Sequence, residues 1–503
     1  MKMHYSITLL IAAAACLSQA QFTTGMRPVP ADLKPGFDSI KTQDGKNFLT
    51  FLSEKCEGRG TGQPGFQKAM DYMAAHFKEF GLKPIMPDGS YFQLVDFWRT
   101  GPDLGASKLS SPRYTATTKE IGISRNGTLD ASGDVVFVYA KGDLESLTDE
   151  VKDAVKDKIV IAKNDSSFKN LENYLMGADA KTVISIVNKL PEPSWNGSRN
   201  EPTLSSTLAR LAVTDKTLHK LLGKEDLDKM KAVMSSPIPA GNVVVAPLAE
   251  QLTAASNSVV EKIKVGNVVA KLEGSDPTLR DEFVGVGAHL DHLGKRGDVV
   301  YPGADDDGSG TTALLQIAKA MSINPIKPKR TVIFMSFYGE EMGLLGSRTF
   351  SDNPPIDLTK MIAELQMDMV GRNSVGPQNG DPKRVDKEEE NRDTIRLVGS
   401  KRISTALDKI IQDQNESIGY RFKYDAEDVY TRSDHYNFAR KGIPIAFFFT
   451  GFHPDYHKPT DTIEKINFDK IANTAKLVYL TIFKLGDHEG MLPHDVDQNG
   501  GGQ

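Results

Sequence analysis

The chain has 503 residues, of which 39% are hydrophobic and 25% charged, and its formal net charge is −5. This length predicts two or three domains, and the composition is typical of a soluble globular protein rather than a disordered one. Acidic and basic residues are mixed along the sequence, which argues against a nucleic-acid partner, and no apolar segment after the N-terminus is long enough to span a bilayer.

Residues 1–20 predict a secretory signal peptide. An apolar run at 7–17 follows a short basic start, and SQA at 18–20 supplies small residues for cleavage after Ala20. We therefore expect a secreted or periplasmic protein with no membrane span after cleavage. The short apolar run disfavours a transmembrane anchor, and the alanines before Cys16 disfavour a lipid anchor there.

Residues 21–114 are expected to form the N-terminal part of the catalytic domain. Helices are predicted at 46–55 and 66–80, separated by the glycine-rich GRGTGQPG, which lacks the Lys-Ser/Thr end of a phosphate loop and is interpreted as a structural turn. Cys56 is the only cysteine left after signal cleavage. An internal disulfide and a cysteine–zinc site are both excluded.

Residues 115–255 are predicted to be an inserted, β-rich α+β domain. Four short strand candidates occur here, separated by polar turns and helix-like segments: 135–140, 158–163, 182–187 and 242–247. No metal-binding or nucleophile cluster lies in this stretch. The alternative is that these strands belong to the main sheet.

Residues 256–488 are expected to form the main part of the catalytic domain, followed by a flexible tail at 489–503. Strands and helices alternate, and the strands are continuous apolar runs: 283–288, 331–338, 361–367 and 443–450. Such runs are typical of strands covered by helices on both faces. The predicted fold is α/β, with a mixed, mostly parallel sheet.

Polar side chains follow these strands where each one ends. His289 follows the first strand, Glu340 and Glu341 the second, and Asp368 the third, while His457 lies in the loop after the fourth. Because ligands of open α/β sheets gather beyond the carboxyl ends of the strands, these residues are expected to converge. Imidazole and carboxylate ligands without cysteine favour a catalytic zinc site.

Two zinc ions would suit this set of side chains. With Asp306 included, three carboxylates balance most of the four positive charges that two zinc ions bring. Glu340 is then left beside a ligand as a general base, and Asp291 is placed to accept the second N–H of His289. His292 and His435 could equally be surface residues or neighbours of the ligands.

Seven motifs along the chain resemble those of the co-catalytic di-zinc aminopeptidase family, which also includes glutamate carboxypeptidases and glutaminyl cyclases. They are EGRGTGQPG, AHLDHLG, GADDDGSG, GEEMGLLGS, QMDMVGR, YTRSDHYNF and DYHKPTDT. The resemblance implies a zinc-exopeptidase fold, and the middle insertion resembles the protease-associated domain that many members carry.

The resemblance also implies a role for each site residue. One zinc ion would bind His289 and Asp368, the other Glu341 and His457, with Asp306 bridging them and a cis peptide bond after it. Glu340 matches the catalytic base, and Asp291 and Asp461 match residues that support the ligands. The motif residues expected to line the substrate pocket are Tyr430, Ser433, Asp434 and His435.

A secreted zinc aminopeptidase that acts on peptides is therefore the leading prediction. A carboxypeptidase or dipeptidase of the same family needs a basic residue for the substrate carboxylate, and Arg372 or Arg432 could supply it. Glutaminyl cyclases typically work with one zinc, whereas this chain has the two-metal set. A non-catalytic binding protein would not need the base Glu340. Side-chain preference and oligomeric state do not follow from the sequence.

Overall fold

The computed structural model describes residues 27–142, 146–164, 171–202, 208–239, 242–296, 299–373, 388 and 391–496. The predicted signal peptide with its cleavage site, and the end of the predicted tail, lie outside the described residues. The chain divides into two compact units, one made of Met1–Val95, Val265–Gly294 and Tyr301–Gln503 and the other of Asp96–Lys264 and Lys295–Val300. Among the described residues, no helix is both long enough and apolar enough to cross a membrane.

A mixed sheet forms the centre of the first unit. Seven of the ten strands in this sheet run in the order β19-β18-β20-β17-β13-β16-β12. The four central strands are parallel to one another, while β12 and β18 pair antiparallel with their neighbours. The strands are β12 (Ser258–Leu272), β13 (Phe283–His289), β16 (Thr331–Phe337), β17 (Met361–Met367), β18 (Thr394–Val398), β19 (Arg421–Lys423) and β20 (Ile445–Phe449). The predicted α/β class is thus confirmed, as are the four apolar strands.

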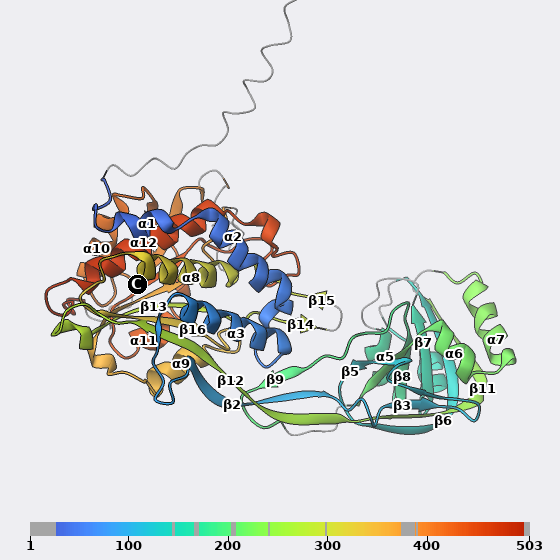
Figure 1. Ribbon diagram of the computed structural model, residues 1–503. Coiled ribbons are helices and arrows are strands. Elements are labelled where there is room, and N and C mark those ends of the chain that lie inside the picture. The colour runs from blue at the N-terminus through green and yellow to red at the C-terminus, as the bar shows by residue number, and fades with distance from the viewer. Residues whose placement is uncertain are drawn as a thin grey trace, which may run out of the picture. The chain divides into compact units, whose positions relative to one another are not determined.

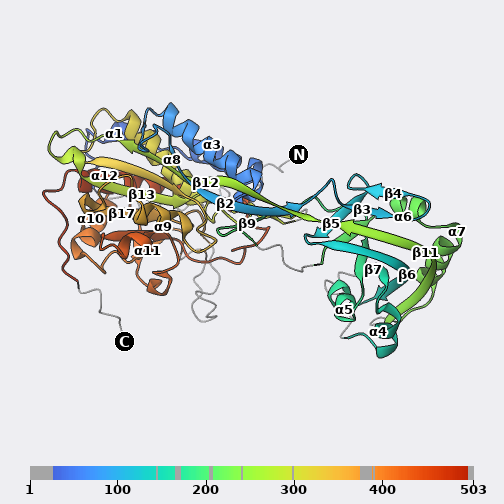
Figure 2. The ribbon, with the colours of Figure 1, turned by 90° about the horizontal axis from the view of Figure 1, so that it is seen from below.

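Helices lie against both sides of these strands, which explains why the strand sequences are apolar throughout. Every residue of β16 and β17 is buried. Figures 1 and 2 show α8 and α12 on one side of the strands and α9 and α11 on the other. The helices of this unit are α1 (Lys34–Ser39), α2 (Thr42–Thr50), α3 (Pro64–Glu79), α8 (Gly308–Ile323), α9 (Leu345–Asp352), α10 (Thr405–Asn415), α11 (His435–Ala439) and α12 (Phe468–Gly486).

The two predicted N-terminal helices are present with shifted ends. The first is α2, which continues as a π-helical turn at Phe51–Lys55, and the second is α3, with Pro64 in its first turn where no backbone N–H partner is needed. Met70, Met73 and Phe77 of α3 recur at spacings of three and four residues, which places them on one helix face, and all three are buried. The glycine-rich segment between the helices lies beside the candidate site described below.

The second unit has its own sheet, with the strand order β4-β3-β11-β6-β7-β8-β10-β5. The four strands predicted between 115 and 255 all belong to this sheet, so the alternative that they join the main sheet is wrong. The strands are β3 (Lys108–Ser110), β4 (Thr115–Thr117), β5 (Ile121–Arg125), β6 (Leu129–Lys141), β7 (Ile159–Asn164), β8 (Thr182–Ile186), β10 (Arg210–Val213) and β11 (Asn242–Ser256). Its helices are α4 (Asp149–Val155), α5 (Leu171–Gly177), α6 (Asp215–Leu221) and α7 (Lys224–Ser235).

The second unit begins and ends further out than the predicted segment 115–255. The long strands β2 (Phe92–Pro102) and β12 carry the chain from one unit to the other, and the division falls within each of them. A boundary inside a regular strand leaves no proline, glycine or polar turn to mark it. Such a boundary therefore has no local sequence signal.

Candidate metal centre

The candidate site lies where four neighbouring parallel strands end. β13 ends at His289, β16 is followed after a short turn by Glu340, β17 is followed directly by Asp368, and the loop after β20 carries His457. Since parallel strands point the same way, their carboxyl ends meet at one edge of the sheet. The structure therefore brings together residues that are up to 168 positions apart in the sequence.

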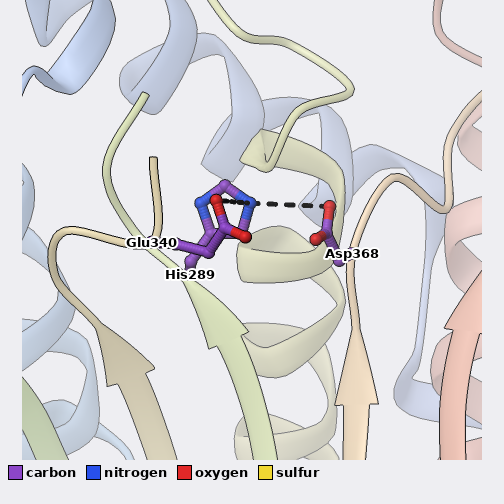
Figure 3. A group of neighbouring side chains, drawn as sticks. All are labelled: His289, Glu340 and Asp368. Atoms are coloured by element: carbon purple, nitrogen blue, oxygen red, sulfur yellow. Dashed lines mark ion pairs between the residues drawn. The ribbon is translucent and has the colours of Figure 1, made fainter. Parts of the chain in front are cut away.

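Three of these residues form a first group. The Nε2 atom of His289 lies 3.5 Å from a carboxylate oxygen of Asp368 and 3.9 Å from one of Glu340. Figure 3 shows the three side chains above the ends of their strands. His289 is buried and Glu340 is nearly so, which keeps the group largely out of bulk water.

A second group lies beside the first and shares a carboxylate with it. His457 Nε2 lies 3.0 Å from Glu341 Oε2 and 3.1 Å from Asp306 Oδ2. The other oxygen of Asp306, Oδ1, lies 3.3 Å from His289 Nε2. His292, for which the sequence left the role open, faces Glu341 and Asp306 in this second group. Asp306 therefore presents one oxygen to each group.

These separations fit two bound zinc ions. Zinc–nitrogen and zinc–oxygen bonds of about 2.0–2.2 Å at a tetrahedral centre place neighbouring ligand atoms roughly 3.3 Å apart. The nitrogen–oxygen distances from Asp306 to His289 and His457 lie within about 0.2 Å of this value. The donor set, imidazoles and carboxylates without thiolate, is one that zinc accepts at catalytic sites.

Burial and mutual repulsion shape the protonation of the site. Burial raises the pKa of Glu340 well above its usual value, and the charges of Asp368 and Glu341 act in the same direction. Burial by itself would lower the pKa of His457, but hydrogen bonding to Asp306 and Glu341 raises it to about 10. The cluster is thus rich in negative charge, which a cation would neutralise. A glutamate with a raised pKa suits a role as general base.

The tautomer of His289 is set by a main-chain carbonyl. Its Nδ1 lies 3.0 Å from the backbone oxygen of Asp291 but 3.8 Å from the Asp291 carboxylate. A carbonyl only accepts, so Nδ1 carries the proton and Nε2 is left for a metal. The prediction that the Asp291 carboxylate takes this proton is corrected, because the turn after β13 brings the main chain closer.

The Asp291 carboxylate instead holds the main chain at Glu340. Its Oδ1 accepts the backbone N–H of Glu340 at 3.0 Å, and its Oδ2 accepts the Thr61 hydroxyl at 3.0 Å. The Thr61 oxygen accepts the N–H of Gly339 at 3.1 Å. The glycine-rich segment thus helps to fix the turn that carries Glu340 and Glu341.

The two aspartates that flank Asp306 hold the surrounding main chain. Asp307 accepts N–H groups of His289, Gly310 and Met369, at distances of 2.9–3.1 Å. Asp305 accepts the N–H of Gly371 at 2.7 Å. Three successive aspartates therefore have different roles, and the peptide bond between Asp306 and Asp307 is cis, as the resemblance implies.

Asp461 supports Asp306 from the opposite loop. Its carboxylate accepts the backbone N–H groups of Asp305 and Asp306 at 3.0–3.2 Å. Burial raises the pKa of Asp461 to about 6. Because Asp461 follows His457 by four residues, this contact ties the loop that carries His457 to the main chain at Asp306.

A buried arginine joins the glycine-rich segment to the ligand loops. Arg59 is fully buried and donates to the main-chain carbonyls of Leu290 at 2.9 Å and of Pro302 and Gly303 at 2.8 Å each. Burial lowers the pKa of its guanidinium. The arginine fixes the loops on either side of Asp306. The sequence did not indicate this buried role, because an arginine in a glycine-rich loop is usually exposed.

A pocket opens beside the two groups. Asp306, Glu340 and Asp368 lie at its metal side. Its remaining walls are mainly apolar and come from several loops and strand ends: Met369, Val429, Arg432, Phe447, Phe449, Phe452 and Tyr456. The aromatic run of β20 supplies two of these walls, a use that its apolar pattern alone did not reveal.

The predicted pocket residues lie elsewhere, and the prediction is corrected. Ser433, Asp434 and His435 are fully buried beneath the pocket, and Tyr430 is half-buried beside it. The motif turns inward at the start of α11, where Ser433 donates to Asp368 at 2.7 Å and the His435 ring lies 2.7 Å from the Tyr430 carbonyl. These side chains support the site from below.

The two arginines considered as carboxylate receptors differ. Arg372 is buried and is engaged by Asp455 at 3.0 Å and Asp461 at 3.7 Å. Arg432 is exposed and lines the pocket, with its guanidinium stacked 4.7 Å from the Phe452 ring. Only Arg432 of these two lies where a substrate could reach it.

Residues 267–482 match the sequence model described as peptidase family M28. A probable leucine aminopeptidase of Trichophyton verrucosum (strain HKI 0517) is 31% identical over 231 residues, which cover 44% of this chain and 58% of that protein. Aminopeptidase Y of Saccharomyces cerevisiae (strain ATCC 204508 / S288c) is 26% identical over 286 residues, which cover 54% of this chain and 48% of that protein. The chain therefore spans about half the length of these curated relatives. A solved aminopeptidase from Aneurinibacillus sp. strain AM-1 is 21% identical, with a TM-score of 0.47, and covers 92% of this chain and 98% of that one.

Proposed function

We propose that this chain, whose residues 267–482 belong to peptidase family M28, is a zinc-dependent aminopeptidase that removes N-terminal residues from peptides. The observation that carries the proposal is the shared carboxylate of Asp306, which faces His289 with one oxygen and His457 with the other. Two zinc ions per chain would be held by His289, Asp368, Glu341 and His457, with Asp306 between them.

Bound zinc would polarise the scissile carbonyl and lower the pKa of water from about 15.7 towards 7. Glu340 takes a proton from the attacking water and later delivers it to the nitrogen of the leaving amine. The backbone of Glu340 is held by Asp291, so its carboxylate stays in place during both proton transfers.

The pocket supports a preference for large apolar N-terminal side chains. Its aromatic walls, including Phe447 and Phe449, offer favourable burial of an apolar group. The relative from Trichophyton verrucosum carries the name leucine aminopeptidase. We assign the same substrate class to this chain.

We also propose that the second unit is an inserted domain of the protease-associated type, predicted from the sequence at residues 115–255. It has a separate sheet and two apolar cores of its own. The site residues named above all come from the first unit. Secretion after cleavage at Ala20 remains part of the proposal.

One observation favours a second candidate, a carboxypeptidase or dipeptidase. Arg432 is a cation in the wall of a pocket whose other charged members are carboxylates at the metal side. A guanidinium so placed could receive the carboxylate of a short peptide. This reading requires cleavage to depend on a free C-terminus.

The experiment compares one peptide in three forms. The zinc-loaded protein is incubated with the free, N-acetylated and C-amidated peptide, with a chelator control, and the products are followed by mass spectrometry. We expect N-terminal residues to be lost from the free and amidated forms only. Cleavage that needs the free carboxylate would replace the aminopeptidase proposal with the second candidate, and no cleavage of any form would overturn both.

A further inference from the structure

His292 is a fully buried histidine that faces the second group of ligands. Its Nδ1 lies 2.7 Å from Glu341 Oε1 and 3.6 Å from Asp306 Oδ2. Within the described part of the chain, no hydrogen bond of acceptable geometry satisfies either nitrogen of this ring. A buried ring nitrogen without a well-formed hydrogen bond is costly, and a cation between Nδ1 and the two carboxylates would remove that cost at Nδ1.

The orientation of the His292 ring is fixed by its surroundings. Gly303 packs so closely that a Cβ there would lie 2.5 Å from the ring, and its φ of 55° also favours glycine. The backbone N–H of His292 donates to the Arg59 carbonyl at 3.2 Å. The ring therefore cannot rotate freely, and its Nδ1 stays directed at Glu341 and Asp306.

We propose that His292 is a protein ligand of the second metal, binding through Nδ1. This inference rests on the two-metal site of the proposed function. The second metal would then have four protein ligands, namely His292, His457, Glu341 and the shared Asp306. The first metal would have three, namely His289, Asp368 and Asp306.

This difference gives the two metals different roles. A zinc ion with four protein ligands is closed, as in structural sites, whereas one with three keeps a position open for water or substrate. The second metal is therefore retained tightly, and the first supplies the open position beside Glu340. On treatment with a chelator, the first metal is released before the second.

The first test uses the metal-free protein labelled with ¹⁵N only in histidine, to which zinc is added stepwise. His289 and His457 face the carboxylates of the two groups through Nε2, whereas His292 faces them through Nδ1. Zinc titration should therefore shift the Nδ1 resonance of His292 strongly and the Nε2 resonances of the other two. The signals of His292 are identified by their loss in His292→Gln. A His292 ring with no metal-induced Nδ1 shift overturns the proposal.

The second test measures zinc affinity by calorimetry. In His292→Gln, one of two binding events should weaken by more than the 10–100-fold typical of a residue that only supports a ligand. The control is His76→Gln, a substitution in α3 of a histidine that faces Glu79 and lies outside both groups, which should leave both events within a few-fold. Two unchanged events in His292→Gln contradict the proposal.

These tests are separable from the proposed function. The protein could bind two zinc ions and show the Nδ1 shift at His292, yet cleave no peptide. That result would support His292 as a metal ligand and contradict the aminopeptidase proposal. Peptide cleavage without any shift at His292 would support the proposed function and contradict the assignment of His292 as a metal ligand.

Discussion

The two units of the chain bury different kinds of side chain. The first buries a dense set of charged groups around the strand ends, among them Arg59, Asp291, Asp306 and Asp307. The second buries aliphatic and aromatic side chains in two cores, and its buried Asp226 accepts backbone N–H groups of Ala249 and Glu250 as a local clamp. Burying charge costs free energy unless partners or metals compensate for it.

This contrast indicates that the first unit tolerates the free-energy cost of buried charge at the candidate site, whereas the second unit does not carry that cost to the same extent. In the first unit, the buried charges hold main-chain loops and leave several side-chain atoms directed at a common point. In the second unit, the buried groups build the fold. Substitutions in the two units should therefore separate loss of activity from loss of stability.

The largest effect is expected for Glu340→Gln. Loss of a general base lowers turnover by roughly 10²–10⁴-fold, while the free energy of unfolding and the bound zinc should stay near their wild-type values. Turnover and metal content are measured on the same sample. Turnover equal to wild type in the zinc-loaded variant would sink the assigned role of Glu340.

The matching change in the second unit is Phe137→Ala. Phe137 is fully buried in an apolar core, so its truncation should cost about 3–5 kcal/mol of stability in that unit. Turnover per folded molecule should remain near wild type at low temperature. Leu104→Ala, at a side chain 47% exposed in the same unit, is the control and should change stability by less than about 0.5 kcal/mol. A loss of turnover in folded Phe137→Ala would contradict the expectation that changes in the second unit affect stability and not activity.

A smaller effect, on zinc affinity, is expected when a buried arginine beside the site is replaced by lysine. The same substitution at a buried arginine away from the site is the comparison. Arg59→Lys should weaken zinc binding by about 10–100-fold, because a lysine cannot reach all the carbonyls that hold the ligand loops. Arg330 is equally buried and also donates to main-chain carbonyls, here of Leu485 and His488. Arg330→Lys should lower stability and leave zinc affinity unchanged. Equal zinc affinity in the two variants would contradict the positioning role of Arg59.

The smallest effect is a pH dependence from His435. Burial lowers the pKa of this ring to about 3. Below pH 6.5 the unfolded chain binds a proton that the folded chain does not, so stability falls as the pH falls from 6.5 towards 3. His435→Gln should reduce the loss between pH 6.5 and 5 by about 1–2 kcal/mol. Unfolding by urea at both pH values measures it, and an unchanged slope would refute it.

Much of the site followed from the sequence because its residues directly follow apolar strands. The runs that became β13, β16 and β17 could be recognised locally, and the residues after them had to meet at one edge. His292 could not be assigned in the same way. Its direction depends on the turn after Asp291 and on close packing against Gly303, neither of which has a local signature.

The remaining differences have similar causes. The pocket walls come from side chains whose positions depend on how the loops after β17 and β20 pack, so the sequence pointed to Ser433 and Asp434, which are buried instead. The boundaries of the second unit lie within long strands. Contacts between segments far apart in the sequence determine the pocket walls and the unit boundaries, and no local sequence pattern indicates such contacts.

The most direct test of the central claim is a zinc titration of the purified, metal-free protein, with bound zinc and peptide cleavage measured at each step. The account predicts that the protein binds two zinc ions per chain and that Asp306→Asn, which alters the shared carboxylate, weakens both binding events. It also predicts cleavage that rises with zinc loading and is abolished by a chelator. A protein that binds one zinc ion or none, or that cleaves equally well without metal, would contradict it.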